Sequence, residues 1–202
     1  MKKISLCLML LWTNVALSDV VSDALQLKLN AIRTMSALFD QVVKAKEHQV
    51  SHSSGTMALA RPGRFRWQTQ SPMAQLVVAD GERLWVYDVE LEQVTLKQQD
   101  KGLGGTAALF LTNDGDTVTR DFDVTAYKEG QKDGYDLHSK SSKANFQRVK
   151  LLFAGHLLSG IELFDQLGQH TVVRLSHVKN NPMLASNLFK FKTPKGVDVV
   201  NQ

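Results

Sequence analysis

The period of the apolar residues constrains this chain more than any other feature of its sequence. From Gly55 onward the period is two, as in residues 64–70, where Phe65 and Trp67 alternate with two arginines. Successive side chains of a β-strand point to opposite faces, so this pattern predicts strands with one apolar face. We expect strands over residues 55–61, 64–70, 76–79, 83–88, 91–97, 122–127, 135–138, 146–153, 158–164, 170–178 and 188–192, separated by turns such as Asp80-Gly81.

The segment before this region has a helical period instead. Between residue 19 and about residue 46, apolar positions recur at spacings of three and four, which predicts one amphipathic helix. The polar residues 48–55 then predict a loop. No helices alternate with the predicted strands, which argues against a doubly wound α/β fold. The pattern favours an antiparallel sheet, closed or nearly closed, with the long helix packed on one face or plugging its mouth. The positions that set the helical period are Leu25, Leu29, Ile32, Ser36, Phe39 and Val43.

The first 18 residues predict an exported protein. Lys2 and Lys3 precede an apolar run over residues 4–12, and residues 16–18 (Ala-Leu-Ser) place small side chains where a signal peptidase reads. We therefore expect a signal peptide over residues 1–18 and a single domain over residues 19–202. Cys7, the one cysteine in the sequence, lies inside the apolar run rather than after it. Neither a lipid anchor nor a disulfide nor a multi-cysteine metal site is expected.

The charge of the chain gives little support to a nucleic-acid partner. The net charge is +4, and removing a signal peptide that contains Lys2 and Lys3 lowers it to +2. Residues 64–67 (Arg-Phe-Arg-Trp) could stack bases on a sheet, but a strand with aromatics inward and arginines outward explains them equally. No apolar run approaches the roughly 20 residues that a membrane-spanning helix needs.

Catalytic and metal-binding motifs are absent from the sequence. It contains no G-x-S-x-G, no H-E-x-x-H, no phosphate-binding loop and no G-x-G-x-x-G. His48 and His52 are four residues apart, but their segment is polar and offers no third ligand. We expect no catalytic residues, no metal and no cofactor, and hence no enzyme.

Arg61 interrupts the alternation. Counting by two from Met57 and Leu59 puts Arg61 on the apolar face, where a charge is costly unless it is paired or meets polar backbone. Two interpretations are equally supported by the periodicity. Arg61 ends a strand beside Pro62 and reaches solvent, or it holds something across the mouth of a barrel.

The motifs around Arg61 resemble those of the LolA family of periplasmic outer-membrane lipoprotein carriers. Residues 61–67 match R-P-x-x-F-x-W, and residues 80–87 match a D-G-x-x-L-W-x-Y hairpin. Residues 189–191 and 194–197 also fit, so the resemblance covers essentially the whole mature chain. It implies an unclosed antiparallel β-barrel, covered by an N-terminal helix and a short lid helix, around an apolar cavity. The lipoprotein receptor LolB shares that fold but is itself a lipoprotein, so the missing lipobox cysteine favours the carrier.

The resemblance also implies a mechanism. A monomeric periplasmic carrier would take triacylated lipoproteins from the inner-membrane LolCDE transporter and deliver them to LolB. Arg61 would hold the lid, expected over residues 106–111, closed by hydrogen bonds to lid backbone. Ala107 stands where relatives often have proline, which leaves the lid boundaries open. A periplasmic binder of other lipids or hydrophobic ligands with the same fold remains the alternative. The residues expected to form the acyl-binding cavity are Leu29, Met57, Leu59, Phe65, Trp67, Leu109 and Phe110.

Overall fold

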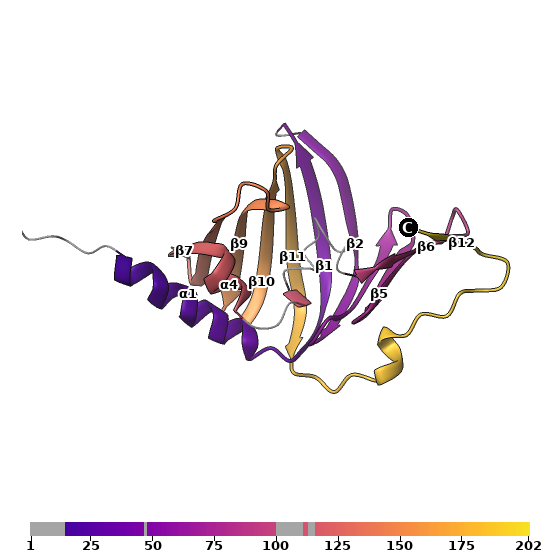
Figure 1. The fold of residues 1–202 in the computed structure, drawn as a ribbon, viewed down its shortest axis with the longest axis horizontal. Coiled ribbons are helices and arrows are strands. Elements are labelled where there is room, and N and C mark those ends of the chain that lie inside the picture. Colours follow the sequence, from indigo (N-terminus) through magenta and orange to yellow (C-terminus); the bar gives the residue numbers. More distant parts are fainter. Residues whose placement is uncertain (1–14, 47, 100–110, 113–115) are drawn as a thin grey trace, which may run out of the picture.

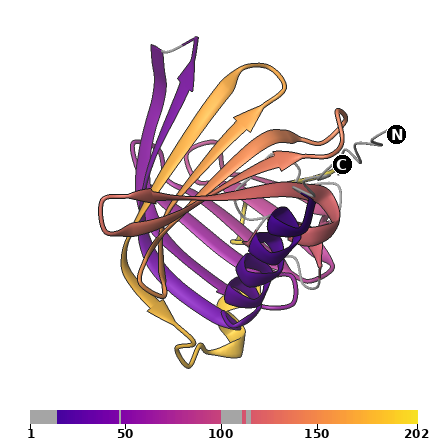
Figure 2. The same ribbon diagram turned by 90° about the vertical axis from the view of Figure 1, so that its left-hand side faces the viewer.

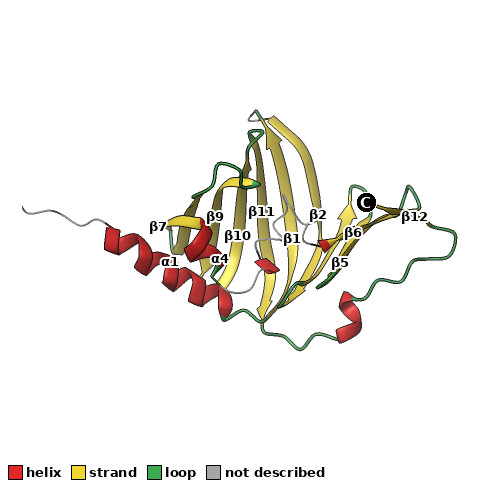
Figure 3. Ribbon diagram, viewed as in Figure 1, coloured by secondary structure: helices red, strands yellow, loops and turns green. Residues whose placement is uncertain are grey.

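A computed structural model describes residues 15–46, 48–99, 111–112 and 116–202 of the chain. Strands dominate these residues, and they form one twelve-stranded sheet (Figures 1 and 3). The elements are α1 (Val15–Asn30), β1 (Thr34–Ala45), β2 (His48–Ala60), β3 (Arg64–Ser71), β4 (Gln75–Asp80), β5 (Arg83–Asp88), β6 (Gln93–Gln98), α4 (Thr117–Asp121), β7 (Phe122–Glu129), β8 (Lys132–Ser139), β9 (Phe146–Ala154), β10 (Leu157–Asp165), β11 (Gln169–Asn180), η1 (Ser186–Phe189) and β12 (Asp198–Asn201).

The sheet is an open barrel with two edges. Its strand order is β12-β6-β5-β4-β3-β2-β1-β11-β10-β9-β8-β7, so β1 lies in the middle and β12 and β7 lie at the edges. Neighbouring strands are antiparallel, except that β12 runs parallel to β6. The sheet curls around an interior without pairing its two edge strands (Figure 2). This confirms the predicted unclosed, mainly antiparallel barrel.

Helix α1 packs against β7 and α4 through one apolar stripe. Leu25 and Leu29 are buried, whereas Leu27 on the opposite side is 71% exposed. The buried Gln26 accepts a hydrogen bond from the Val118 amide at 2.8 Å, which fixes the start of α4 to α1. The ammonium of Lys28 lies 4.5 Å from the centre of the Phe153 ring, a favourable cation–π distance. Apolar burial and these two polar contacts therefore hold α1 beside the concave side of the sheet (Figure 2).

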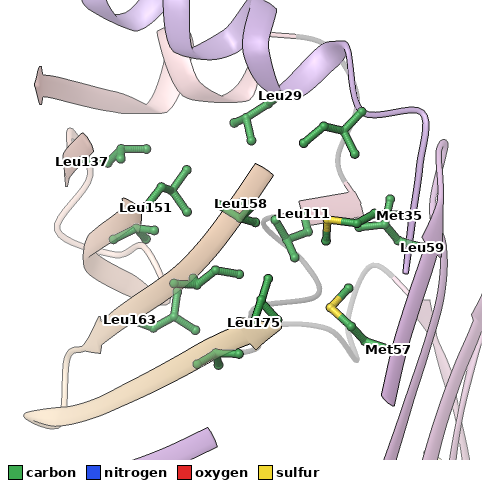
Figure 4. Packing of buried hydrophobic residues seen from close by; sticks show 14 of the residues in the cluster. Leu29, Met35, Met57, Leu59, Leu111, Leu137, Leu151, Leu158, Leu163 and Leu175 are labelled. Atoms are coloured by element: carbon green, nitrogen blue, oxygen red, sulfur yellow. The ribbon is translucent and has the colours of Figure 1, made fainter. Parts of the chain in front are cut away.

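The core fills the end of the barrel where α1 lies. It is built from the inward residues of the strands, with Leu29 from α1 and Leu111 (Figure 4). Figure 4 shows Leu111 among the side chains of this cluster, near Leu158 and Met35. Each such side chain, when fully buried, stabilises the fold by about 1.5–3 kcal/mol relative to exposure.

The helix predicted over residues 19–46 is wrong beyond Asn30. The chain turns after α1 and continues as β1, in which Met35, Ala37 and Phe39 are buried and Leu38 is 42% exposed. A spacing of four residues satisfies both a helical period and a period of two, so the two patterns overlap. Pairing of β1 with β2 on one side and β11 on the other decides in favour of the strand.

Two more boundaries differ from the sequence-based expectation. The loop predicted over residues 48–55 is the first half of β2, whose exposed polar residues pair with the far end of β1. A strand tip with solvent on one face and an open cavity on the other needs no apolar alternation, so the pattern carries no strand signal there. The strand predicted over residues 188–192 is also wrong, because η1 ends at Phe189 and the chain continues without pairing until β12.

The segment after β11 covers the outer face of the sheet instead. Phe189 is 2% exposed and packs on Ala58 and Ala60, whose small side chains leave room for η1. Phe191 then lies 6.1 Å from Trp85, ring centre to ring centre. The aromatic residues of this segment are therefore committed to the outer face, which leaves the inner face of β3–β5 to the cavity.

Candidate functional site

Three stacked aromatic rings form the centre of the inner face. The Phe39 and Trp67 rings lie 3.8 Å apart at 23°, and Phe65 lies 5.8 Å from Trp67. Gly55 makes this stack possible, because a Cβ there would lie 1.9 Å from the Gln68 carbonyl oxygen and 3.0 Å from the Phe39 ring. The Phe39 ring thus covers a backbone surface that only glycine provides.

A cavity of about 740 Å³ lies above this stack. Phe65, Trp67 and Leu84 line its depth, and it is bounded by residues close to the β1–β2, β3–β4, β5–β6 and β10–β11 turns. Two of its wall residues, Val50 and Met73, are 58% and 60% exposed, so the cavity reaches solvent at these turns. Its volume lies within the roughly 300–1,000 Å³ typical of ligand pockets.

Along β3, β4 and β5, the side chains that face the cavity change from apolar at its deep end to polar at its mouth. In register across the three strands, Phe65, Ala79 and Leu84 form the deepest row, and Trp67, Val77 and Val86 form the next. The outermost row is polar: Thr69 pairs with Gln75, and Gln75 pairs with Asp88. Four residues separate the first and last rows on β3, which is about 13 Å along an extended strand.

The wall formed by β1, β2, β10 and β11 mixes apolar and polar side chains without such a gradient, since Gln41 lies deeper along β1 than Val43. Leu163 and Val43 line it together with Gln169 and Thr171 from β11. Gln41 and Ser53 face each other across β1 and β2, with 3.5 Å between the Gln41 Nε2 and the Ser53 Oγ. A ligand with an apolar body and a polar neutral end fits both walls at once.

Arg61 lies at the other end of the barrel. It directly follows β2, is 8% exposed, and its amide donates to the Arg33 carbonyl at 2.9 Å. Next to it, the Gly63 amide lies 3.3 Å from the Thr112 carbonyl that accepts its hydrogen bond. The burial of Arg61 excludes the interpretation in which it ends a strand and reaches solvent.

Gln99 joins the turn that follows Arg61 to the next turn of the sheet. Its side-chain Nε2 donates to the Gly63 carbonyl at 2.7 Å, and its Oε1 accepts from the Gly81 amide at 3.0 Å. Gly63 has φ +68°, and a Cβ there would lie 3.1 Å from the Gln99 Nε2. The chain therefore leaves β6 and returns at Thr112 against the same β2–β3 turn.

The residues predicted for the acyl-binding cavity fall into three groups. Phe65 and Trp67 line the cavity. Leu29, Met57 and Leu59 are at most 3% exposed and belong to the packed core beside it. Leu109 and Phe110 lie outside the described residues, as does all but the last residue of the predicted lid. Of that lid, Leu111 is described and is 2% exposed in the core.

The sequence interpretation missed the polar wall residues. Thr69 and Gln75 share the phase of their apolar strand neighbours Trp67 and Val77, a signal that was available in the sequence. Gln41 and Ser53 were assigned to a helix and a loop, so their common face could not be recognised.

None of the described groups with a shifted pKa lines the cavity. A hydrogen bond from the Arg148 Nε to Asp136 Oδ1, 2.7 Å long, lowers the pKa of the Asp136 carboxyl. Burial lowers the pKa of Arg66, which also lies behind the sheet and whose Nη1 is 3.4 Å from the Leu188 carbonyl. These pairs support the sheet and leave the chemistry of the cavity unchanged.

Within the described ranges, no cluster of three or more His, Cys, Asp or Glu side chains could hold a metal ion. None of the helices described there is long and apolar enough to span a membrane.

Comparison with known proteins assigns the family. The family model described as "Outer membrane lipoprotein carrier protein LolA" matches residues 30–192. The chain belongs to the LolA family. An outer-membrane lipoprotein carrier protein of Legionella pneumophila (strain Paris) is 58% identical over 202 residues, which is the full length of both chains. One from Dechloromonas aromatica (strain RCB) is 38% identical, over 89% of this chain and 87% of that protein.

The solved structures extend the likeness of the fold. An uncharacterized conserved protein from Thermus thermophilus is 12% identical, with a TM-score of 0.57 over 91% of this chain and 99% of that one. At that identity the likeness concerns the fold alone.

Proposed function

We propose that this LolA-family protein is a periplasmic carrier that moves triacylated lipoproteins between membranes. It would receive them from the inner-membrane LolCDE transporter and deliver them to the outer-membrane receptor LolB, as a monomer and without catalysing a reaction. A signal peptide over residues 1–18 would direct it to the periplasm and leave residues 19–202 as the working domain. The observation that carries this proposal is the 740 Å³ cavity, with its aromatic and aliphatic depth, in a chain of the LolA family.

The cavity suits acyl chains energetically. Each methylene that leaves water contributes about 0.8 kcal/mol, so a chain of roughly 16 carbons gains about 12 kcal/mol when fully buried. A carrier must also release this cargo, so part of that gain has to be offset. Breaking contacts of the empty protein when cargo binds would supply the offset.

We assign that role to Arg61. It would hold the lid, which includes Leu109 and Phe110, closed over the empty barrel and so lower the affinity for cargo. Two observations support this assignment. Arg61 is buried, and the Gly63 amide two residues away donates to the Thr112 carbonyl, one residue beyond the predicted lid. The residue that directly follows the predicted lid is therefore hydrogen-bonded to the turn that follows Arg61.

Native mass spectrometry tests the function. The protein is co-expressed with a tagged outer-membrane lipoprotein, purified from periplasm and analysed before and after addition of soluble LolB. The proposal expects triacylated lipoprotein bound to the protein and released by LolB. Free fatty acid or phospholipid bound in its place would support the alternative, a binder of other lipids with the same fold.

A further inference from the structure

The polar row at the mouth of the cavity is placed to contact the head group of an acylated ligand. Thr69, Gln75 and Asp88 stand side by side on β3, β4 and β5, one row above Trp67. All three are half-buried and line the cavity. A ligand whose acyl chains fill the apolar rows must place its head group against this row.

The wall across the cavity repeats that chemistry. Gln41 and Ser53 line it as a pair, and Gln169 lies four residues farther out along the strands, with Val43 between them, so amide and hydroxyl groups reach the cavity from this side as well. A glutamine amide has two N–H donors and one carbonyl acceptor, and a hydroxyl both donates and accepts. Such groups match ester and amide linkages, which carry carbonyl acceptors and amide donors but no net charge.

Asp88 adds a charge to the row. Its Oδ1 accepts a hydrogen bond from the Leu91 amide at 3.1 Å, which fixes the carboxylate at the start of the β5–β6 turn. An anionic group bound next to the Asp88 carboxylate would be repelled, because two like charges in contact repel each other even at the high effective dielectric constant of a surface site.

From these observations we propose that the polar row selects the head group of the ligand. Thr69 and Gln75, with Gln41 and Ser53 opposite, hydrogen-bond the neutral ester and amide linkages of an acylated N-terminal cysteine, and the Asp88 carboxylate disfavours the phosphodiester of a phospholipid. The two ligands share a diacylglyceryl unit, but a triacylated cysteine adds a third, amide-linked acyl chain. The head-group contribution must therefore be measured on ligands with two acyl chains each. This inference rests on the proposed carrier function. It identifies the neutral linkages of the head group as the part of the cargo that the polar row recognises.

Lipid extraction from vesicles tests the selection. The purified protein is incubated with phosphatidylcholine vesicles that contain equal mole fractions of dipalmitoyl phosphatidylglycerol and a neutral Cys-Ser peptide amide that carries an S-dipalmitoylglyceryl group and an N-acetyl group, so that both ligands have two palmitoyl chains. Vesicles are removed by centrifugation, and mass spectrometry measures the protein-bound lipids. We expect the acylated peptide to exceed phosphatidylglycerol about tenfold, the discrimination that about 1.4 kcal/mol gives.

Variants isolate the contribution of the polar row to lipid uptake from that of the rest of the protein. Asp88→Asn retains the acceptor for the Leu91 amide and should raise phosphatidylglycerol uptake about fivefold, with peptide uptake within about twofold. Gln75→Leu should lower peptide uptake about fivefold by removing hydrogen bonds to its linkages. The matched control is Glu90→Gln, which removes a charge from the same turn outside the cavity wall and should change neither ratio.

The outcomes distinguish this inference from the carrier function itself. Equal uptake of both lipids by the unaltered protein, or an equal effect of Glu90→Gln and Asp88→Asn, overturns the selection. If the protein still passes lipoprotein to LolB in that case, the carrier function stands. If the protein takes up neither lipid and passes no lipoprotein to LolB, both proposals fail.

Discussion

Replacing Trp67 with alanine tests the cavity at its centre. Truncation of a fully buried tryptophan costs about 3–5 kcal/mol of stability, but Trp67 is only partly buried because one face borders the cavity. We expect a loss of about 2–3 kcal/mol, of which roughly 1 kcal/mol comes from the stack with Phe39 at 3.8 Å. The melting temperature should fall by about 5–10 °C.

The effect on ligand binding follows from the exposed face of the ring. An acyl chain lying on it would cover about 60 Å², roughly a third of what an aromatic side chain can bury. At about 25 cal/mol per Å² this contributes about 1.5 kcal/mol, or a tenfold change in affinity. Equilibrium binding of a triacylated Cys-Ser peptide amide, measured beside urea unfolding, gives both quantities for one variant.

Trp85→Ala is the matched control. Trp85 lies on the outer face against Phe191 and is not part of the cavity wall. Its truncation should destabilise the protein by a comparable amount and leave peptide affinity within about twofold. The reasoning is refuted if Trp67→Ala binds the peptide as tightly as the unaltered protein, or if Trp85→Ala weakens binding equally.

Four other substitutions test the supporting structure and the proposed role of Arg61. Gly55→Ala should cost about 3 kcal/mol or prevent folding, since its Cβ would collide with a backbone carbonyl, whereas Gly160→Ala makes ordinary contacts and should cost under about 1 kcal/mol in urea unfolding. Asp136→Asn should cost about 1 kcal/mol at pH 7. Because pairing with Arg148 lowers the pKa of Asp136, this contribution is present above the ordinary carboxyl pKa and is lost as the pH falls through the folded-state value, so unfolding curves of variant and parent should converge in acid. Arg61→Leu should trap bound lipoprotein; normal transfer to LolB by this variant would exclude the proposed role of Arg61.

The strands from β3 to β11 were predictable because each buries one face. Phe65 and Trp67 repeat at a period of two, and the favoured turn at Asp80-Gly81 places β4 beside β5. The same logic failed for β1. Its inward residue Phe39 and the last residues of α1 happen to satisfy a helical spacing, and only pairing with two neighbouring strands distinguishes the alternatives.

The candidate site was predictable only in part. Phe65 and Trp67 could be identified as inward-facing aromatics, but the division between packed core and open cavity depends on depth within the barrel. Leu59 and Phe65 are direct partners on neighbouring strands, yet only Phe65 borders the cavity. The polar row required the register of β3, β4 and β5, which no local pattern in the sequence specifies.

Site-specific photo-crosslinking in cells tests the central claim most directly. A benzophenone amino acid replaces Trp67 in one variant and Trp85 in another, and the adducts are identified by mass spectrometry after irradiation. The account predicts adducts with the acyl chains of outer-membrane lipoproteins at position 67 and none at position 85. Lipoprotein transfer that continues with no adduct at position 67, or with equal adducts at both positions, would contradict it.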